Sequence, residues 1–197
     1  YFDLAEDVKK LLEERGIVNS FLIGHSMGGK AAMVLDKLYQ GFISKLVVVD
    51  IAPVTYAPNF KNYLKTLSSL DLGGFNTRSE IDTKLSEYFE EVSFRSFLMQ
   101  NLKMNEKKSF YWRVNLTSLI RNSVAISEFP VINGVSNTEA LFLYGELSEY
   151  GVMEHKDTIQ KSFPLSEFAP VAKAGHWVHV EKPVKFLEIV TKFIKSD

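Results

Sequence analysis

A serine between two glycines is the first place in this sequence where chemistry is expected. The segment Gly24-His25-Ser26-Met27-Gly28 follows the short apolar run Ser20–Ile23 and precedes a helix-forming run from Lys30 to Tyr39. A serine hydroxyl is a weak nucleophile at neutral pH, so it needs an exposed position and a base that takes its proton. A sharp turn between a strand and a helix gives that exposure. The pattern therefore predicts that Ser26 is a covalent nucleophile.

The glycines around this serine are expected to have a steric role. Side chains at Gly24, Gly28 and Gly29 would clash with the neighbouring strand and helix. The helix after the turn directs its first N–H groups at developing negative charge, and we predict the N–H of Met27 as an oxyanion donor. An ordinary glycine-rich turn and a phosphate-binding loop are the competing interpretations. The strand and helix around the motif argue against the first, and Lys30 lacks the G-x-x-x-x-G-K-[ST] spacing of the second.

A base for this serine is expected after the last strand, where the sequence reads Gly175-His176-Trp177-Val178-His179. Of the other histidines, His25 lies in the turn itself and His155 in a predicted surface helix. His176 and His179 could instead form a metal pair, but no third histidine or carboxylate stands at a suitable spacing. We therefore predict His176 as the base, a structural role for His179, and no metal.

The acid that orients the base has two candidate positions. Asp50 ends the strand that directly follows the serine unit, where an unpaired buried carboxylate would be costly. It could also simply cap the next turn. The second position is the loop after Leu143-Tyr144-Gly145, where the acidic residues are Glu146, Glu149 and, further on, Asp157. The residues alone leave both positions open.

These side chains need a sheet to position them. Continuous apolar runs without alternation are typical of strands that are covered on both faces in a parallel sheet. Such runs occur at Ser20–Ile23, Lys45–Asp50, Ala140–Gly145 and Glu167–Ala172, with predicted helices at 2–14, 30–39, 150–163 and 183–194. Strands that alternate with helices predict an α/β fold with a mostly parallel sheet and flanking helices.

The stretch from about residue 55 to residue 129 departs from this rhythm. Its apolar spacing predicts several short helices, and Thr77-Arg78-Ser79-Glu80 looks like a capping box for the second of them. We expect a single domain over residues 1–197 with this stretch as a helical lid insertion. The residues predicted to contact the substrate are His25, Phe60, Trp112, Val114 and Trp177.

Composition limits the partners. The 197 residues carry 23 lysines and arginines against 24 aspartates and glutamates, a balance that suits a small neutral substrate better than nucleic acid. The chain has no cysteine, which excludes disulfides, thiolate catalysis and cysteine-bound zinc. No apolar run has the length of a transmembrane segment, and the first residues lack the layout of a signal peptide. We expect no cofactor.

Three segments carry a resemblance to a known family: Gly24-His25-Ser26-Met27-Gly28-Gly29-Lys30-Ala31, Val49-Asp50-Ile51-Ala52-Pro53-Val54, and the stretch from Ala174 to Pro183. Together they resemble one branch of the α/β-hydrolases. This branch holds bacterial short-chain esterases of the YbfF type, mitochondrial abhydrolase-domain esterases and fungal ethanol acetyltransferases, and the likeness covers essentially the whole chain. It implies that Asp50 is the catalytic acid.

The resemblance also implies a reaction. Ser26 would attack the carbonyl of a small acyl ester or thioester, with His176 moving the proton, and water or an alcohol would then take the acyl group. Water gives esterase or thioesterase activity, and an alcohol acceptor gives acetyltransferase activity. The likeness further implies a mitochondrial protein, with the cytoplasm as the alternative.

One departure from the family concerns the start of the chain. In this branch several strands precede the serine turn, and a His-Gly loop among them supplies the second oxyanion donor. Ser26 stands close to the first residue here, so we expect a part of a longer protein or a truncated product with an exposed sheet edge. Loss of one such donor typically costs about 10²–10³ in rate. A non-catalytic hydrolase-like fragment with a binding or structural role is the alternative function.

Overall fold

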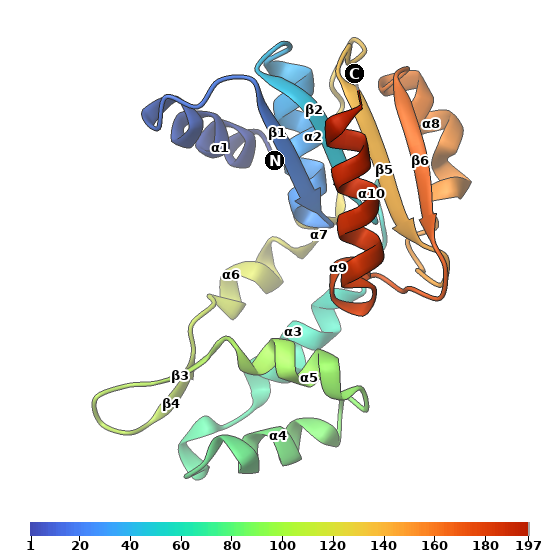
Figure 1. Ribbon diagram of the computed structural model, residues 1–197. Coiled ribbons are helices and arrows are strands. Elements are labelled where there is room, and N and C mark those ends of the chain that lie inside the picture. Colours follow the sequence, from blue (N-terminus) through green and yellow to red (C-terminus); the bar gives the residue numbers. More distant parts are fainter. Residues whose placement is uncertain (197) are drawn as a thin grey trace. The chain divides into compact units, whose positions relative to one another are not determined.

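The computed structural model describes residues 1–196, which form two compact units (Figure 1). Unit 1 contains residues 1–56 and the described residues from 128 onward, and unit 2 contains residues 57–127. Within the described residues, no helix combines the length and the apolar character that crossing a bilayer requires.

Unit 1 is built on a four-stranded parallel sheet with the order β1-β2-β5-β6. The strands are β1 (Ser20–His25), β2 (Ile43–Val49), β5 (Glu139–Gly145) and β6 (Ser166–Val171). The four predicted strands are confirmed, with bounds shifted by at most a few residues. The central strands β2 and β5 are almost entirely buried, which explains their unbroken apolar sequences.

Helices cover both faces of this sheet (Figure 1). Side chains of α1 (Phe2–Glu14), α2 (Met27–Leu38) and α8 (Lys156–Ser162) join the hydrophobic cluster on one face. Those of α9 (Val178–Glu181) and α10 (Pro183–Lys195) join the cluster on the other face. The single helix predicted over 150–163 is instead the 3₁₀ turn η2 (Val152–His155) followed by α8, because Gly151 adopts a left-handed conformation just before them.

Strand register brings the ends of β1, β2 and β5 to one edge of the sheet. His25 pairs with Val49, and Val49 pairs with Leu143. The next residues continue this ladder, since the N–H of Ser26 donates to Val49 O (3.0 Å) and that of Asp50 donates to Leu143 O (2.8 Å). The two predicted catalytic residues therefore follow neighbouring strands at the same edge.

A buried lysine holds together the two segments of unit 1 that flank unit 2. Lys30 is only 2% exposed, and its Nζ donates to the carbonyl of Glu128 (3.0 Å) while lying 5.0 Å from the ring centre of Tyr56. Burial lowers the pKa of Lys30 to about 8. The chain thus leaves and re-enters unit 1 at adjacent places.

Unit 2 is not purely helical. Its helices are α3 (Phe60–Ser69), the 3₁₀ turn η1 (Leu72–Gly74), α4 (Arg78–Ser86), α5 (Val92–Met99), α6 (Leu116–Arg121) and α7 (Ser123–Ser127). Between α5 and α6 lies an antiparallel hairpin of β3 (Leu102–Met104) and β4 (Phe110–Trp112). The prediction of helices alone was wrong for this segment, because strands of three residues are too short to show alternation in the sequence.

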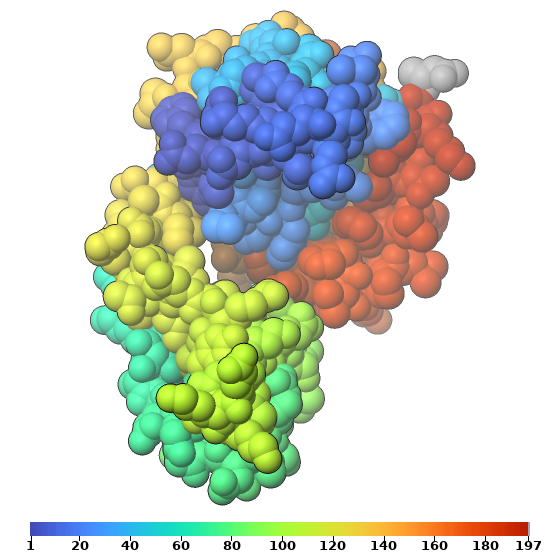
Figure 2. All heavy atoms as spheres, turned by 90° about the vertical axis from the view of Figure 1, so that its left-hand side faces the viewer, coloured from blue at the N-terminus to red at the C-terminus, as the bar shows by residue number. Residues whose placement is uncertain are grey.

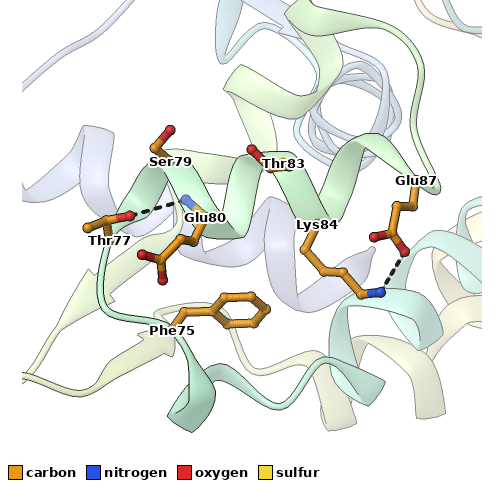
Figure 3. Close-up of a pocket in the computed structure, with 7 residues that line it drawn as sticks. All are labelled: Phe75, Thr77, Ser79, Glu80, Thr83, Lys84 and Glu87. Carbon is orange, nitrogen blue, oxygen red and sulfur yellow. Dashed lines mark hydrogen bonds and ion pairs between the residues drawn. The ribbon is translucent and has the colours of Figure 1, made fainter.

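The capping box predicted in unit 2 is confirmed at the start of α4. Figure 3 shows the hydroxyl of Thr77 directed at the backbone N–H of Glu80, which donates to it over 3.2 Å. In return the Glu80 carboxylate accepts from the N–H of Asn76 at 2.8 Å, one residue before the cap. The Thr77 hydroxyl thereby bonds one of the first N–H groups of α4, which have no acceptor within the helix, and the Glu80 carboxylate bonds the residue before the cap.

Two leucines of unit 1 give a matched test of this core. Leu143 in β5 is fully buried, whereas Leu187 on α10 is 64% exposed. We expect Leu143→Ala to lower the free energy of unfolding by about 2–5 kcal/mol, since it removes a core side chain and leaves a cavity. Leu187→Ala should stay within about 0.5 kcal/mol of the parent. Urea denaturation followed by circular dichroism measures both, and equal losses would contradict the described core.

Candidate active site

The serine lies in a strained turn between β1 and α2. Ser26 has φ 54° and ψ −121°, a left-handed conformation that a residue with a side chain rarely adopts. A Cβ on Gly24 would lie 2.4 Å from the carbonyl oxygen of Gly28, and one on Gly29 would lie 2.7 Å from Ile51. The steric prediction is confirmed for these two glycines. It was wrong for Gly28, where a Cβ would meet nothing within 4 Å because this residue faces outward from α2.

Asp50 is the most completely enclosed polar group at this edge of the sheet. It has no exposed surface and also adopts a left-handed conformation, with φ 54°. Its Oδ1 accepts the N–H of Gly145 at 2.9 Å, while Oδ2 accepts the hydroxyl of Ser148 and faces His176 Nδ1 at 2.7 Å. All three contacts suit a carboxylate, which only accepts hydrogen bonds.

This contact sets the tautomer of His176. Because the carboxylate of Asp50 accepts, Nδ1 carries the hydrogen, and the lone pair of the neutral ring lies on Nε2. The ring of Tyr150 stacks on the imidazole with 4.2 Å between centroids and 23° between planes. The imidazole is therefore held both at its edge and on its face.

The loop after β5 supplies two contacts that the sequence did not suggest. Ser148 bonds the Asp50 carboxylate, and the N–H of Tyr150 in turn donates to the Ser148 hydroxyl at 3.3 Å. The hydroxyl of Tyr56 fixes the same loop by donating to the carbonyl of Tyr150 at 3.1 Å, and burial raises the pKa of Tyr56. On the sequence alone, this loop indicates only candidate carboxylates, those of Glu146 and Glu149. The signal that the sequence offers for the contact with Asp50 is Ser148, a polar residue that closely follows the end of β5.

His25 contacts the main chain of the base. Its Nε2 lies 2.9 Å from the carbonyl oxygen of His176, and the two ring centres are 4.5 Å apart. Burial, and then the nearby His176, lower the pKa of His25 to about 4, so the neutral ring donates Nε2–H to that carbonyl at neutral pH. His179 and Trp177 also lie against the His25 ring, at 4.8 and 5.4 Å between centroids. Substrate contact by His25 and Trp177 stays a prediction.

The remaining predicted residues are divided between the two units. Met27 is the first residue of α2, where a backbone N–H has no acceptor within its own helix. Phe60, Trp112 and Val114 belong to unit 2, and the indole N–H of Trp112 donates there to the carbonyl of Leu67 at 3.1 Å. Their roles as oxyanion donor and substrate contacts stay predictions. Within residues 1–196, no three side chains of the metal-binding types converge on one point.

Comparison with known proteins gives the family. The family model described as alpha/beta hydrolase fold matches residues 1–183. The chain belongs to the α/β-hydrolase fold family. It is 34% identical to the sn-1-specific diacylglycerol lipase ABHD11 of Mus musculus, over 98% of this chain and 65% of that protein. It is 30% identical to esterase YbfF of Escherichia coli, over 100% of this chain and 75% of that protein.

A solved structure agrees with the assignment. A marine microorganism esterase superposes on this α/β-hydrolase chain with a TM-score of 0.91 at 34% identity, covering 96% of this chain and 75% of that one. The predicted fold class and the predicted branch are thereby confirmed. The chain spans 63–65% of the length of the ABHD11 relatives that it matches.

The buried state of His25 predicts how the stability of this α/β-hydrolase depends on pH. Unfolded His25 takes up a proton near its ordinary pKa of 6.5, whereas the folded form does so only near 4. Below about pH 6.5 the unfolded state therefore binds more protons, and the free energy of unfolding falls as pH falls toward about 4. We expect His25→Asn to show a smaller loss between about pH 7 and pH 5 than the parent in urea denaturation. Measurements above pH 7, where His25 is neutral in both states, give the baseline, and equal slopes would refute the assignment.

Proposed function

We propose that this protein is a serine acyl hydrolase or acyltransferase that acts on acyl esters or thioesters through an acyl-enzyme on Ser26. One observation carries the proposal. A fully buried Asp50 carboxylate lies 2.7 Å from His176 Nδ1, at the sheet edge where the strained turn presents Ser26. The names of the relatives, esterase and lipase, support this class of activity.

In the first half of the reaction, His176 Nε2 takes the proton of Ser26 as Oγ bonds to the substrate carbonyl carbon. Asp50 stabilises the resulting imidazolium, and Gly145 and Ser148 hold the carboxylate in place. The carbonyl oxygen becomes an oxyanion, for which the N–H of Met27 and the N-terminal end of α2 are the proposed donors. His176 then gives its proton to the departing alcohol or thiol.

In the second half, an acceptor attacks the acyl-enzyme on Ser26. His176 takes the proton of the acceptor, and the acyl group leaves the serine. Water yields a carboxylic acid, and an alcohol yields a new ester. Both outcomes use the same residues, so the acceptor is decided by how far the site excludes water. Turnover of an acyl-CoA in water with and without ethanol, followed by product analysis, separates the two.

We also propose a mitochondrial location, which cell fractionation tests.

The nucleophile can be tested by covalent labelling. A fluorophosphonate should label the folded parent protein. Ser26→Ala should abolish this labelling and should lower the turnover of a short p-nitrophenyl ester by at least about 10³-fold. Ser68→Ala, at an exposed position on α3, is the control that should leave both unchanged. Absence of labelling in the folded parent protein would reject the catalytic proposal in favour of a binding or structural role.

The acid can be tested by an isosteric change. Asp50→Asn keeps the shape but offers an amide in place of a carboxylate, so the imidazole loses the group that fixes Nδ1–H. We expect kcat to fall by about 10²–10⁴ with little change in KM, as for an interaction made mainly in the transition state. Ser148→Ala should have a smaller effect, of about tenfold, because Gly145 and His176 still bond the carboxylate.

Glu146→Gln is the matched control for this test, since Glu146 belongs to the loop that offered the alternative acids. Thermal unfolding of each variant separates loss of catalysis from loss of fold. A large loss of kcat in Glu146→Gln together with an active Asp50→Asn would overturn the assignment of the acid.

A further inference from the structure

The β3–β4 hairpin of unit 2 gathers cationic side chains that catalysis does not use. Residues 103–113, called the basic hairpin below, contain four cationic residues and one acidic residue, Glu106. The cations are Lys103, Lys107, Lys108 and Arg113. All four are exposed, and no ion pair in the described part of the chain includes them. Figure 2 shows the hairpin, in yellow-green, at the surface turned toward the viewer.

The positive charge of unit 2 is concentrated in this hairpin. Residues 57–127 carry ten lysines and arginines against seven aspartates and glutamates, and outside the basic hairpin the counts are six and six. The near-neutral balance of the whole chain therefore hides a local cluster of three net positive charges. A charge cluster of this kind attracts anions within about 10 Å at moderate ionic strength.

Two exposed apolar side chains accompany the cations. Met104 is 50% exposed and Tyr111 is 45% exposed. Tyr111 lies directly across the ladder from Lys103, while Met104 pairs with the buried Phe110 and extends beyond the hydrophobic core of unit 2. Side chains at paired positions share a face of the ribbon, so Tyr111 and Lys103 lie together on one face, and Met104 is the exposed end of the opposite face, which also carries the buried Phe110.

The turn holds the tip in a defined shape. The carboxamide oxygen of Asn105 accepts the N–H of Ser109 at 2.9 Å, and its carbonyl accepts the N–H of Lys108 at 3.0 Å. Lys108 has a φ of 59°, so a lysine stands where glycine is the usual choice. The backbone that carries Lys107 and Lys108 is thus ordered before any binding, which lowers the entropy cost of docking.

We propose that the basic hairpin docks this protein on an anionic lipid surface, with Met104 and Tyr111 entering the headgroup region and the four cations contacting lipid phosphates and carboxylates. Apolar and aromatic groups bordered by lysine and arginine are the combination that binds such interfaces. Nucleic acid would use the cations but would leave Met104 without a favourable environment. The inference goes beyond the proposed reaction, because docking requires neither Ser26 nor an ester substrate.

Vesicle co-sedimentation tests the proposal. The parent protein should bind vesicles of phosphatidylcholine with about 30% phosphatidylserine at about 0.1 M salt, and should bind pure phosphatidylcholine at least about tenfold more weakly. Lys107→Glu/Lys108→Glu should weaken binding to the anionic vesicles by at least about tenfold. Met104→Ser/Tyr111→Ser, which leaves the charge unchanged, should weaken binding to the anionic vesicles by several fold.

Lys65→Glu/Arg121→Glu is the matched control, since both residues are exposed in unit 2, carry the same charge change and lie outside the basic hairpin. It should retain most of the binding, and Ser26→Ala should retain all of it. Circular dichroism and thermal unfolding confirm that each variant folds. Equal binding to neutral and anionic vesicles, equal losses in the hairpin and control variants, or hairpin-dependent binding to an oligonucleotide without vesicle binding would each overturn the proposal.

Discussion

The site in unit 1 depends on the burial of one carboxylate, that of Asp50, which has no access to water. Burying an unpaired charge would cost several kcal/mol, so Asp50 requires donors that are already in place when the protein is folded. They come from the end of β5, from the loop that follows it and from the loop that carries His176. The need to satisfy one side chain therefore fixes the relative positions of three segments that lie far apart in sequence: the end of β2 with Asp50, the end of β5 with its loop, and the loop that carries His176.

The parallel sheet makes this arrangement possible. Its register places the residues after β1 and β2 side by side, and both Ser26 and Asp50 then adopt left-handed backbone conformations. Each such residue costs about 1–2 kcal/mol relative to the ordinary conformation. The buried strands β2 and β5, packed on both faces, offset that cost. Ser26 and Asp50 place backbone strain at the edge of the sheet where the chemistry is proposed, a common location for it in enzymes.

Much of this could be predicted because the signals are local. An apolar run, a glycine-flanked serine and a helix-forming run together specify the turn at Ser26, and buried parallel strands have distinctive sequences. The choice between Asp50 and the glutamates after β5 was open on the residues alone, because it depends on which side chain the fold turns toward His176. Ser148 and Tyr150 were missed for the same reason, since a hydroxyl bonded to a carboxylate and a ring stacked on an imidazole leave no pattern along the chain. The β3–β4 hairpin was missed because its strands are too short to alternate.

The place where unit 2 interrupts unit 1 has a consequence for the order of folding. The segment β1-α2-β2 is made before unit 2, but β5, which pairs with β2 and supplies the Gly145 donor, follows it. Until β5 arrives, Asp50 lacks its partners, and the loop that must close contains all of residues 57–127. The entropy of closing a loop grows with its flexible length, so early collapse of unit 2 shortens the effective loop. The contact of Lys30 with Glu128 and Tyr56 then keeps the two ends of unit 2 close together. The chain that leads to β5 therefore starts near β2, and less entropy is lost when the two strands pair.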